Sequence, residues 1–381
     1  MDNNNAGMAK ALLVGFLTRF SFIFSLQAIP PLFPMLIDEF KMSFTLASSL
    51  MWLVAIPGLL ISILGGLLAT RYRVKTLLTI GLSLCVLSSL LSFASNTISL
   101  FQIGRFILGI GGALAVVSAS TLLFQWFEKG KLGMAMGVFG LCMAAGTVAA
   151  FNGLGFIASS YGWRLSILVT VVINILALLI CVGLTKEKSG TVVQKIKLEP
   201  LKNINIWILG LGWALFNMAA LGYTTWGKTI FTRYYGLTMD YSDLLASMLM
   251  LGAFIQPLTG FISDMLGKRR ILIIISCAIA FAIFLLFPYS LSSHFILLAL
   301  GLGLATAFVP PAMFALSGEI LGPGKGAIGF GILNTFLNVG IIFGPLSVGY
   351  ILDITDSSHL SFLTLAIFSL SASFLAIRAK C

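Results

Sequence analysis

The chain has 381 residues, of which 59% are hydrophobic and only 9% are charged. Soluble domains carry about 25% charged residues, so this composition excludes an ordinary water-soluble fold and indicates a surface that faces lipid. The net charge of +11 is divided among short Lys and Arg clusters between apolar runs, which excludes a nucleic-acid-binding face and is typical of loops that flank membrane helices.

Apolar runs long enough to cross a bilayer, which takes about 20 residues, recur along the whole chain. The first run follows a polar N-terminus that has no cleavage pattern, so we expect it to be retained as a helix. The runs predict an all-α membrane protein with twelve transmembrane helices. In chain order they cover residues 11–36, 44–70, 75–95, 97–125, 131–158, 163–185, 204–232, 240–264, 270–290, 293–319, 326–352 and 358–378.

The basic residues predict the orientation of these spans. If the N-terminus is cytoplasmic, most Lys and Arg residues lie inside, and the outside keeps only Lys41, Arg164, Arg233 and, near a helix end, Lys228. An odd number of spans would destroy this bias. We therefore expect both termini to be cytoplasmic. We expect a plasma (inner) membrane location, since no eukaryotic targeting signal or glycosylated outer loop is obvious.

The longest polar connection, residues 186–203, contains Lys, Glu, a Ser-Gly pair and a Pro, as a flexible cytoplasmic linker does. It separates a predicted N-terminal six-helix bundle at 1–185 from a predicted C-terminal six-helix bundle at 204–381. Glycines recur in the two bundles at one constant offset, and parallel repeats of this kind place a substrate path between the halves, near the bilayer midplane. The related glycines include Gly66 and Gly260, Gly109 and Gly303, and Gly137 and Gly331.

Two inner loops carry a resemblance to a known family. The segment GFISDMLGKRR at 260–270 resembles the loop signature of the major facilitator superfamily, G-x-x-x-D-x-x-G-R/K-R/K. Its first-half counterpart, GLLATRYRVK at 66–75, departs from the signature, with Thr70 in place of Asp and Arg73 in place of Gly. Arg105, followed by a run of glycines, resembles the fourth-helix R-x-x-x-G-x-G pattern of the same family.

The resemblance implies two pseudo-symmetric six-helix bundles that rock about a central site, with spans three, six, nine and twelve on the lipid side. It also implies that the basic inner loops close the cytoplasmic side. In the fifth span, Ala150-Phe151-Asn152-Gly153 stands where proton-coupled drug antiporters have a G-P pair, which counts against a drug exporter. The gating residues that we predict are Gly66, Arg71, Lys75, Gly260, Asp264, Gly267, Lys268 and Arg269.

Two arginines lie within predicted spans, where an ionised side chain costs at least about 2.5–3.5 kcal/mol. Arg19 either meets an anionic substrate in the central cavity or snorkels to the cytoplasmic headgroups. Arg105 either orients a coupling or substrate group, as the resemblance implies, or binds a neighbouring helix end. All twelve acids, Asp243 and Asp353 among them, fall in loops or near helix ends. We therefore expect no deeply buried acid, which favours an exchanger, a facilitator or coupling through the charge of the substrate.

Uncharged polar and aromatic side chains within the spans complete the predicted substrate site. Each amide has an alternative role, because buried amides often bind a neighbouring helix for about 0.6 kcal/mol. With Arg19 and Arg105, the predicted substrate-binding residues are Gln27, Asn152, Trp213, Asn217, Tyr223, Gln256, Asn334 and Asn338.

These features predict a secondary active or facilitative transporter that works by alternating access and moves a small organic anion of the carboxylate type. An exporter of drugs or hydrophobic compounds is the alternative, and a non-transporting membrane sensor is a remote one. The sequence has no P-loop spacing and no clustered His or Cys residues, so we expect no enzyme activity, nucleotide, cofactor or metal. The partners that we expect are a small-molecule substrate and the lipid bilayer, and we expect a monomer.

Overall fold

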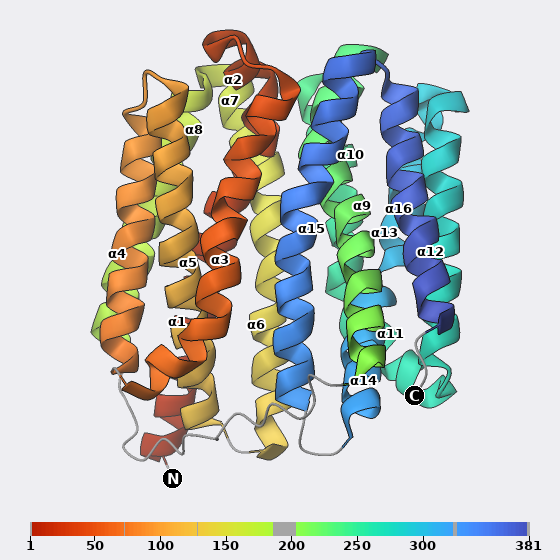
Figure 1. Cartoon of the computed structure of the whole chain (residues 1–381). Coiled ribbons are helices and arrows are strands. Elements are labelled where there is room, and N and C mark those ends of the chain that lie inside the picture. Colours follow the sequence, from red (N-terminus) through yellow and green to blue (C-terminus); the bar gives the residue numbers. More distant parts are fainter. Residues whose placement is uncertain (1, 72, 128, 186–202, 323–325, 379–381) are drawn as a thin grey trace. The chain divides into compact units, whose positions relative to one another are not determined.

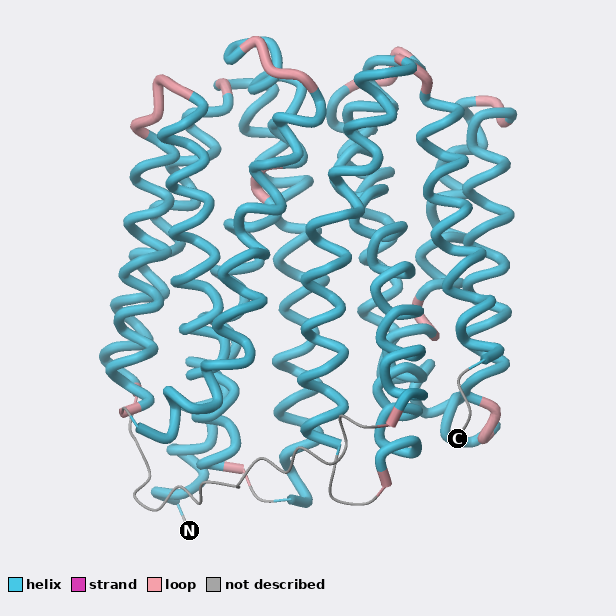
Figure 2. The backbone as a smooth tube through the Cα atoms, viewed as in Figure 1, coloured by secondary structure: helices cyan, strands magenta, loops and turns pink. Residues whose placement is uncertain are grey.

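The computed structural model describes residues 2–71, 73–127, 129–185, 203–322 and 326–378, and every regular element in these ranges is a helix (Figures 1 and 2). This part of the chain contains 12 helical segments long and apolar enough to cross a membrane. The predicted all-helical membrane fold is therefore confirmed. The chain divides into two compact units, which are described separately.

The first unit comprises Met1–Leu32 and Leu53–Lys195. Its core is built where α4 packs along α5 and where α1 packs against α5, α6 and α8. Small residues such as Ala115 and Ala119 allow these helices to approach closely, and larger apolar side chains such as Leu82 and Phe139 fill the space between them. The helices are α1 (Asp2–Gln27), α4 (Val74–Phe93), α5 (Ile98–Trp126), α6 (Lys129–Ala149), α7 (Gly155–Tyr161) and α8 (Trp163–Leu184).

The second unit comprises Phe33–Trp52 and Ile196–Cys381. Its longest helix, α9, packs along α15 and α16 and is joined to α10 by a short turn. The helices are α2 (Phe33–Phe40), α9 (Ile204–Tyr235), α10 (Met239–Leu251), α11 (Gln256–Leu266), α12 (Arg269–Leu286), α13 (Phe295–Thr306), α14 (Val309–Leu321), α15 (Gly326–Thr355) and α16 (Ser358–Arg378).

Helix α3 (Phe44–Arg71) begins in the second unit and ends in the first. Residues 33–52 thus pack with the C-terminal half of the chain, although they lie in the N-terminal half of the sequence. The linker predicted at 186–203 falls outside the described residues except for Asn203, so the division into bundles at 1–185 and 204–381 stays a prediction.

Several predicted spans are interrupted rather than continuous. The first is split into α1 and α2 by a 3-10 turn at Pro30–Leu32, because Pro30 and Pro31 lack the backbone donors that a helix needs. The fifth contains a π-helical turn at Ala150–Leu154, and the eighth a 3-10 turn at Gly252–Ile255. The tenth breaks just before α14, whose first turn contains a proline pair.

The helices of spans three, six, nine and twelve, which are α4, α8, α12 and α16, expose large apolar side chains along their length. On α8 Leu179 is 64% exposed, and on α16 Phe374 is 56% exposed. Exposed leucine and phenylalanine at this density suit a surface in contact with acyl chains, where they cost nothing in hydration.

Candidate functional site

In the first unit, Gln27 ends α1 at the break before the 3-10 turn and is only 1% exposed. Neither its amide nitrogen nor its amide oxygen has a hydrogen-bond partner among the described residues. A buried polar atom without a partner costs about 1–3 kcal/mol. Its amide therefore keeps a donor and an acceptor that no described residue uses.

The structure places Arg105, on α5, against the C-terminal end of α1. Its side chain is 2% exposed, and its Nη1 and Nη2 atoms donate to the carbonyl oxygens of Ser25 and Leu26 at 2.8 and 2.9 Å. The last carbonyls of a helix have no partners within the helix and carry partial negative charge, so a guanidinium group satisfies both needs. Of the two alternatives predicted for Arg105, these contacts correspond to the one in which it binds a neighbouring helix end.

A buried polar network adjoins this contact and ties α1 to α4 and α8. The Nδ2 atom of Asn174 donates to the hydroxyls of Ser25 and Ser89, each at 2.8 Å. A small cavity lies beside it, lined by Arg105 and by Ser88, Ser92 and Thr170 among others. Three helices of the first unit, α4, α5 and α8, are thus fixed around the C-terminal end of α1, two residues before Gln27.

Arg19 lies two turns before Gln27 on α1 and points towards α6. Its guanidinium carbon lies 4.5 Å from the centroid of the Phe139 ring, a cation–π contact. Phe139 lies ten residues into α6, about 15 Å along the helix. Arg19 has no ion pair with any described residue. Its charge is therefore held inside the span against an aromatic face.

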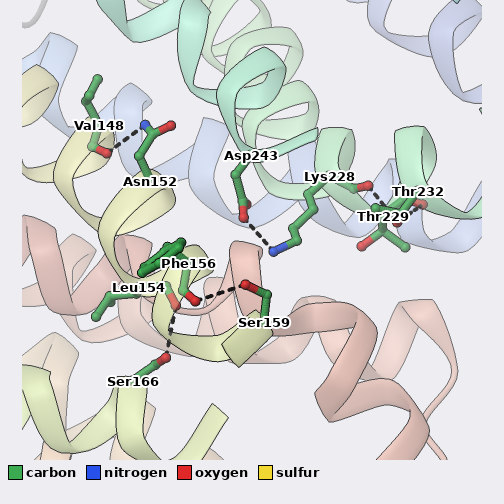
Figure 3. A network of polar contacts seen from close by, with 10 residues as sticks. All are labelled: Val148, Asn152, Leu154, Phe156, Ser159, Ser166, Lys228, Thr229, Thr232 and Asp243. Carbon is green, nitrogen blue, oxygen red and sulfur yellow. Dashed lines mark hydrogen bonds and ion pairs between the residues drawn. The ribbon is translucent and has the colours of Figure 1, made fainter. Parts of the chain in front are cut away.

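Asn152 lies in the π-helical turn that interrupts the fifth span. Its Nδ2 atom donates to the carbonyl oxygen of Val148 at 2.9 Å (Figure 3), and the side chain is exposed. The turn packs against the 3-10 turn at Pro30–Leu32. Two irregular segments of the first unit therefore meet next to Gln27, and π-helical turns of this kind are frequent at functional sites.

In the second unit, the predicted residues of α9 have different roles. Tyr223 is 1% exposed and donates its hydroxyl to the Leu245 carbonyl oxygen of α10 at 2.8 Å, so it belongs to the core between these helices. Trp213 is 5% exposed and stacks on Phe216, and its indole nitrogen has no described partner. Asn217 is 6% exposed and donates to the Trp213 carbonyl oxygen of its own helix at 2.7 Å.

The amides of α15 lie on the helix next to Asn217. A Cβ atom added at Gly340 would lie 2.5 Å from Asn217 Cβ, which places the two helices in close contact at this level. Asn338 donates to the Asn334 carbonyl oxygen at 3.0 Å, and both side chains are half-buried. Gln256 is half-buried at the start of α11. The structure thus brings Asn217 close to α15.

Two of the predicted gating residues of the second unit, Asp264 and Arg269, form a polar cluster with Glu319. Arg269, at the start of α12, binds Asp264 at 2.6 Å and also binds Glu319 of α14. Gly267 ends α11 and Lys268 precedes α12, while Gly260 faces Pro311 of α14. In the first unit, Lys75 is exposed at the start of α4. The surroundings of Gly66 and the side chain of Arg71 lie outside what the structure describes.

The expectation that no acid is buried is wrong for Asp243. On α10, Asp243 is 1% exposed, and its Oδ2 atom lies 2.5 Å from Nζ of Lys228 on α9, which is 0% exposed (Figure 3). A signal for this pair was present in the sequence. Lys228 lies eight residues before Gly236 and Asp243 lies seven after it, so a helical hairpin that turns at Gly236 brings both to the same level.

Asp353, which the sequence places near a helix end, has a partner in the second unit. Its two carboxylate oxygens accept hydrogen bonds from the backbone nitrogens of Phe44 and Thr45, each at 2.7 Å. These nitrogens belong to the first turn of α3, where backbone donors have no partner within the helix. A carboxylate at this position also interacts favourably with the helix dipole. Asp353 thus caps α3 from the last turn of α15.

Comparison with known proteins relates the chain to a family. The sequence profile of the Major Facilitator Superfamily matches residues 15–302 and, in a second match, residues 230–380. The lysosomal dipeptide transporter MFSD1 of Danio rerio is 21% identical over 325 residues, which are 78% of this chain and 70% of the relative. The probable nitrate transporter NarT of Staphylococcus carnosus is 24% identical over 357 residues, which are 90% of this chain and 89% of the relative.

Solved structures share the fold. The crystal structure of a bacterial homolog to the human lysosomal transporter Spinster, in an inward-facing and occupied conformation, has a TM-score of 0.79 at 18% identity. The similarity covers 97% of this chain and 96% of that chain. The unoccupied conformation of the Spinster homolog gives a TM-score of 0.76 at 17% identity. The likeness extends over nearly the whole chain and concerns the fold.

Proposed function

Because the chain belongs to the Major Facilitator Superfamily, we propose that it carries a small organic anion of the carboxylate type by alternating access. Its family and its named relatives make it an integral, multi-pass membrane transporter and not an enzyme. The proposal further includes a plasma (inner) membrane location, cytoplasmic termini and a monomeric state.

The observation that carries the anion proposal is the environment of Arg19. A guanidinium group inside a span needs a counterion or a water-filled cavity, and no described acid pairs with Arg19. Its contact with Phe139, far from the beginning of α6, argues against the alternative in which it reaches the headgroups. A carboxylate matches the fork of donors on arginine. Gln27 would supply a donor and an acceptor two turns further along α1.

The names of the relatives agree with an anionic group in the substrate. Nitrate, in the name of the staphylococcal relative, is an anion. A dipeptide, in the name of the zebrafish relative, ends in a carboxylate. Both anionic groups can pair with a cationic side chain, and Arg19 is the residue that we assign to this role.

One observation favours the second candidate, an exporter of hydrophobic compounds. Phe16, Phe20 and Phe24 stack in succession along α1, with ring centroids 5.9 and 5.8 Å apart, and they lie next to Arg19 in the sequence. Aromatic surfaces of this kind bind lipophilic cations and flat apolar molecules.

The test is thermal unfolding of the detergent-purified protein with small carboxylates, nitrate, dipeptides and lipophilic cations. A ligand that binds the folded state stabilises it by about 2.7 kcal/mol at a hundredfold excess over its dissociation constant. We expect carboxylates to raise the unfolding midpoint in the wild type and not in Arg19→Gln. The matched control is Arg378→Gln, because Arg378 also lies over a phenylalanine ring, that of Phe374 near the end of α16. A shift with lipophilic cations alone would establish the exporter instead.

A further inference from the structure

The buried ion pair between Lys228 and Asp243 has no role in the site built around Arg19. Both side chains are almost fully buried, at 0% and 1% exposure. Removing one partner of such a pair is strongly destabilising, because the other charge is then left without compensation in a medium of low dielectric constant. A pair of this kind therefore responds to any change in the charge of either member.

Unused hydrogen-bonding capacity accompanies the pair. Asp243 Oδ2 binds Lys228, whereas Asp243 Oδ1 has no hydrogen-bond partner among the described residues. The hydroxyls of Ser242 on α10 and of Thr225 and Thr229 on α9 are also buried and have no described partner. Buried polar atoms are nearly always satisfied in native proteins, so the unpaired Asp243 Oδ1 is free to accept a proton.

The pair also shares a helix face with a predicted substrate residue. Lys228 lies eleven residues after Asn217 on α9, which is about three turns, so the two side chains leave the helix in nearly the same direction. Thr225, three residues before Lys228, lies on this face as well. Lys228 is thus on the face of α9 that carries Asn217, about 16 Å along the helix from it.

We propose that Lys228 and Asp243 form a site that takes up one proton and one anion together. The proton, taken from solvent, forms an O–H bond at Asp243 Oδ1, and the anion replaces Asp243 as the counterion of Lys228. The pair is electrically neutral before this step, and the site is neutral again after it. Protonation alone would leave a buried ammonium without a counterion, so each ligand favours binding of the other. This inference rests on the proposed anion transport.

The other charged and titratable groups near the pair have partners or positions of their own. Asp240, one turn earlier on α10, is the other carboxylate that acts on Asp243. Helix α13, which packs against α10, has no titratable side chain.

The helices packed against α9 carry the remaining groups. On α15, Asp353 caps α3, and Tyr350 is exposed. On α16, His359 packs on Tyr289, and Arg378 is at the far end, while Glu319 of α14 binds Arg269. On α9 itself, the Tyr223 hydroxyl donates to a carbonyl oxygen, and the Arg233, Tyr234 and Tyr235 side chains follow Lys228 in the last turns.

The experiment measures proton uptake on anion binding to the full-length, detergent-purified protein. Sodium nitrate or sodium lactate is added at matched pH to a weakly buffered solution that contains a pH-indicator dye, and binding is followed in parallel by thermal unfolding. We expect about one proton to be taken up per bound anion. The dissociation constant of the anion should rise about tenfold per pH unit on the alkaline side, because one proton is linked to binding.

Asp243→Asn mimics the protonated carboxyl, so this variant should bind the anion without proton uptake and with an affinity independent of pH. The matched control Asp240→Asn removes the same charge one turn away and should keep the tenfold dependence. Binding to the wild type without proton uptake would overturn the inference and leave the proposed function standing, whether or not the variants fold. Asp243→Asn with the pH dependence of the wild type would also overturn it. If no anion binds at any pH, the proposed function itself fails and the inference falls with it.

Discussion

Arg105 is the side chain of α5 that binds the C-terminal end of α1. Its guanidinium holds two carbonyl oxygens at the end of α1, and hydrogen bonds to charged groups contribute about 1.5–3 kcal/mol each. Arg105→Gln keeps a polar group there but cannot span both carbonyls. We expect the free energy of unfolding to fall by about 2–4 kcal/mol, measured as a lower thermal midpoint in detergent.

The control for Arg105→Gln is Arg164→Gln, since Arg164 donates to Ser95 and Asn96 near the start of α8, where the contacts are long and partly exposed. This control should change the midpoint little. If Arg105→Gln lowered substrate affinity with an unchanged midpoint, Arg105 would act on the substrate and not on the end of α1.

Gln27 leads to the opposite expectation for stability. Its amide is buried without described partners, and replacing an unsatisfied polar group by an apolar one of similar shape is neutral or stabilising. We therefore expect Gln27→Leu to leave the ligand-free unfolding midpoint unchanged or raised, and to abolish the increase that a bound carboxylate produces. A variant that is less stable without ligand would mean that Gln27 has a structural partner.

The sequence was sufficient to find Arg19 and Gln27 as polar groups within spans, but it did not predict what they contact. Contacts such as that of Arg105 with Ser25 depend on how neighbouring helices are rotated about their axes, and an apolar sequence with little periodicity does not encode this rotation strongly. Asp243 was misjudged for a related reason. Asp243 lies near the beginning of α10, and this position indicated an exposed side chain. Its burial follows instead from Lys228, which faces it from the other helix of the hairpin.

At the scale of helices, the close packing of α4 on α5 depends on Gly81. A Cβ atom there would lie 2.6 Å from the Ala115 nitrogen and 2.7 Å from the Gly111 oxygen, both in the backbone of α5. Gly81→Ala must therefore separate the two helices, and we expect a loss of about 1–3 kcal/mol of stability, measured by thermal unfolding. Gly137→Ala on α6 is the control, since a Cβ atom there meets nothing within 4 Å.

In the control Gly137→Ala, the better helix propensity of alanine should stabilise the protein by up to about 1 kcal/mol. Equal effects of the two substitutions would show that the α4–α5 contact is looser than described.

The existence of the spans could be predicted because about 20 apolar residues are needed to cross a bilayer and the chain contains 12 such segments. The breaks within them were only partly foreseeable. Pro30 and Pro31 predict the interruption of the first span, because proline has no backbone N–H to donate within a helix. The π-helical turn at Ala150–Leu154 has no comparable signal, because an extra residue in a helix is accommodated by packing and not by the chemistry of any one side chain.

For the molecule as a whole, α3 is the described helix that continues from one compact unit into the other. Its first turn is held in the second unit by Asp353, by the edge of the Trp226 ring against Phe44, and by Arg233 over the same phenylalanine. The beginning of α3 is therefore fixed by α15 and α9. Any movement of the second unit that releases this contact would act directly on a helix that ends in the first.

This arrangement predicts a local effect of Asp353→Ala. The amides of Phe44 and Thr45 lose their acceptor, and substitution of a helix-capping carboxylate by alanine costs about 0.5–2 kcal/mol. We expect faster hydrogen–deuterium exchange in a peptide that covers residues 44–50, and unchanged exchange in the core of α16. The control Asp356→Ala removes an exposed carboxylate that pairs with Arg233 at 3.5 Å. Exchange that rises equally in both variants would contradict the capping role.

In the hairpin of α9 and α10, the length of the turn determines whether Lys228 and Asp243 face each other. Gly236 has φ +64 at the turn, and Lys228 and Asp243 lie at nearly equal distances on either side of it. One inserted residue in residues 236–238 would rotate α10 by about 100° relative to its hydrophobic face, and Asp243 would leave the level of Lys228. Over evolutionary time the turn can therefore change length only if both charges are lost together. Among descendants of a common ancestor, a hairpin with this ion pair should keep a turn of fixed length, while hairpins that lack both charges should tolerate insertions and deletions there.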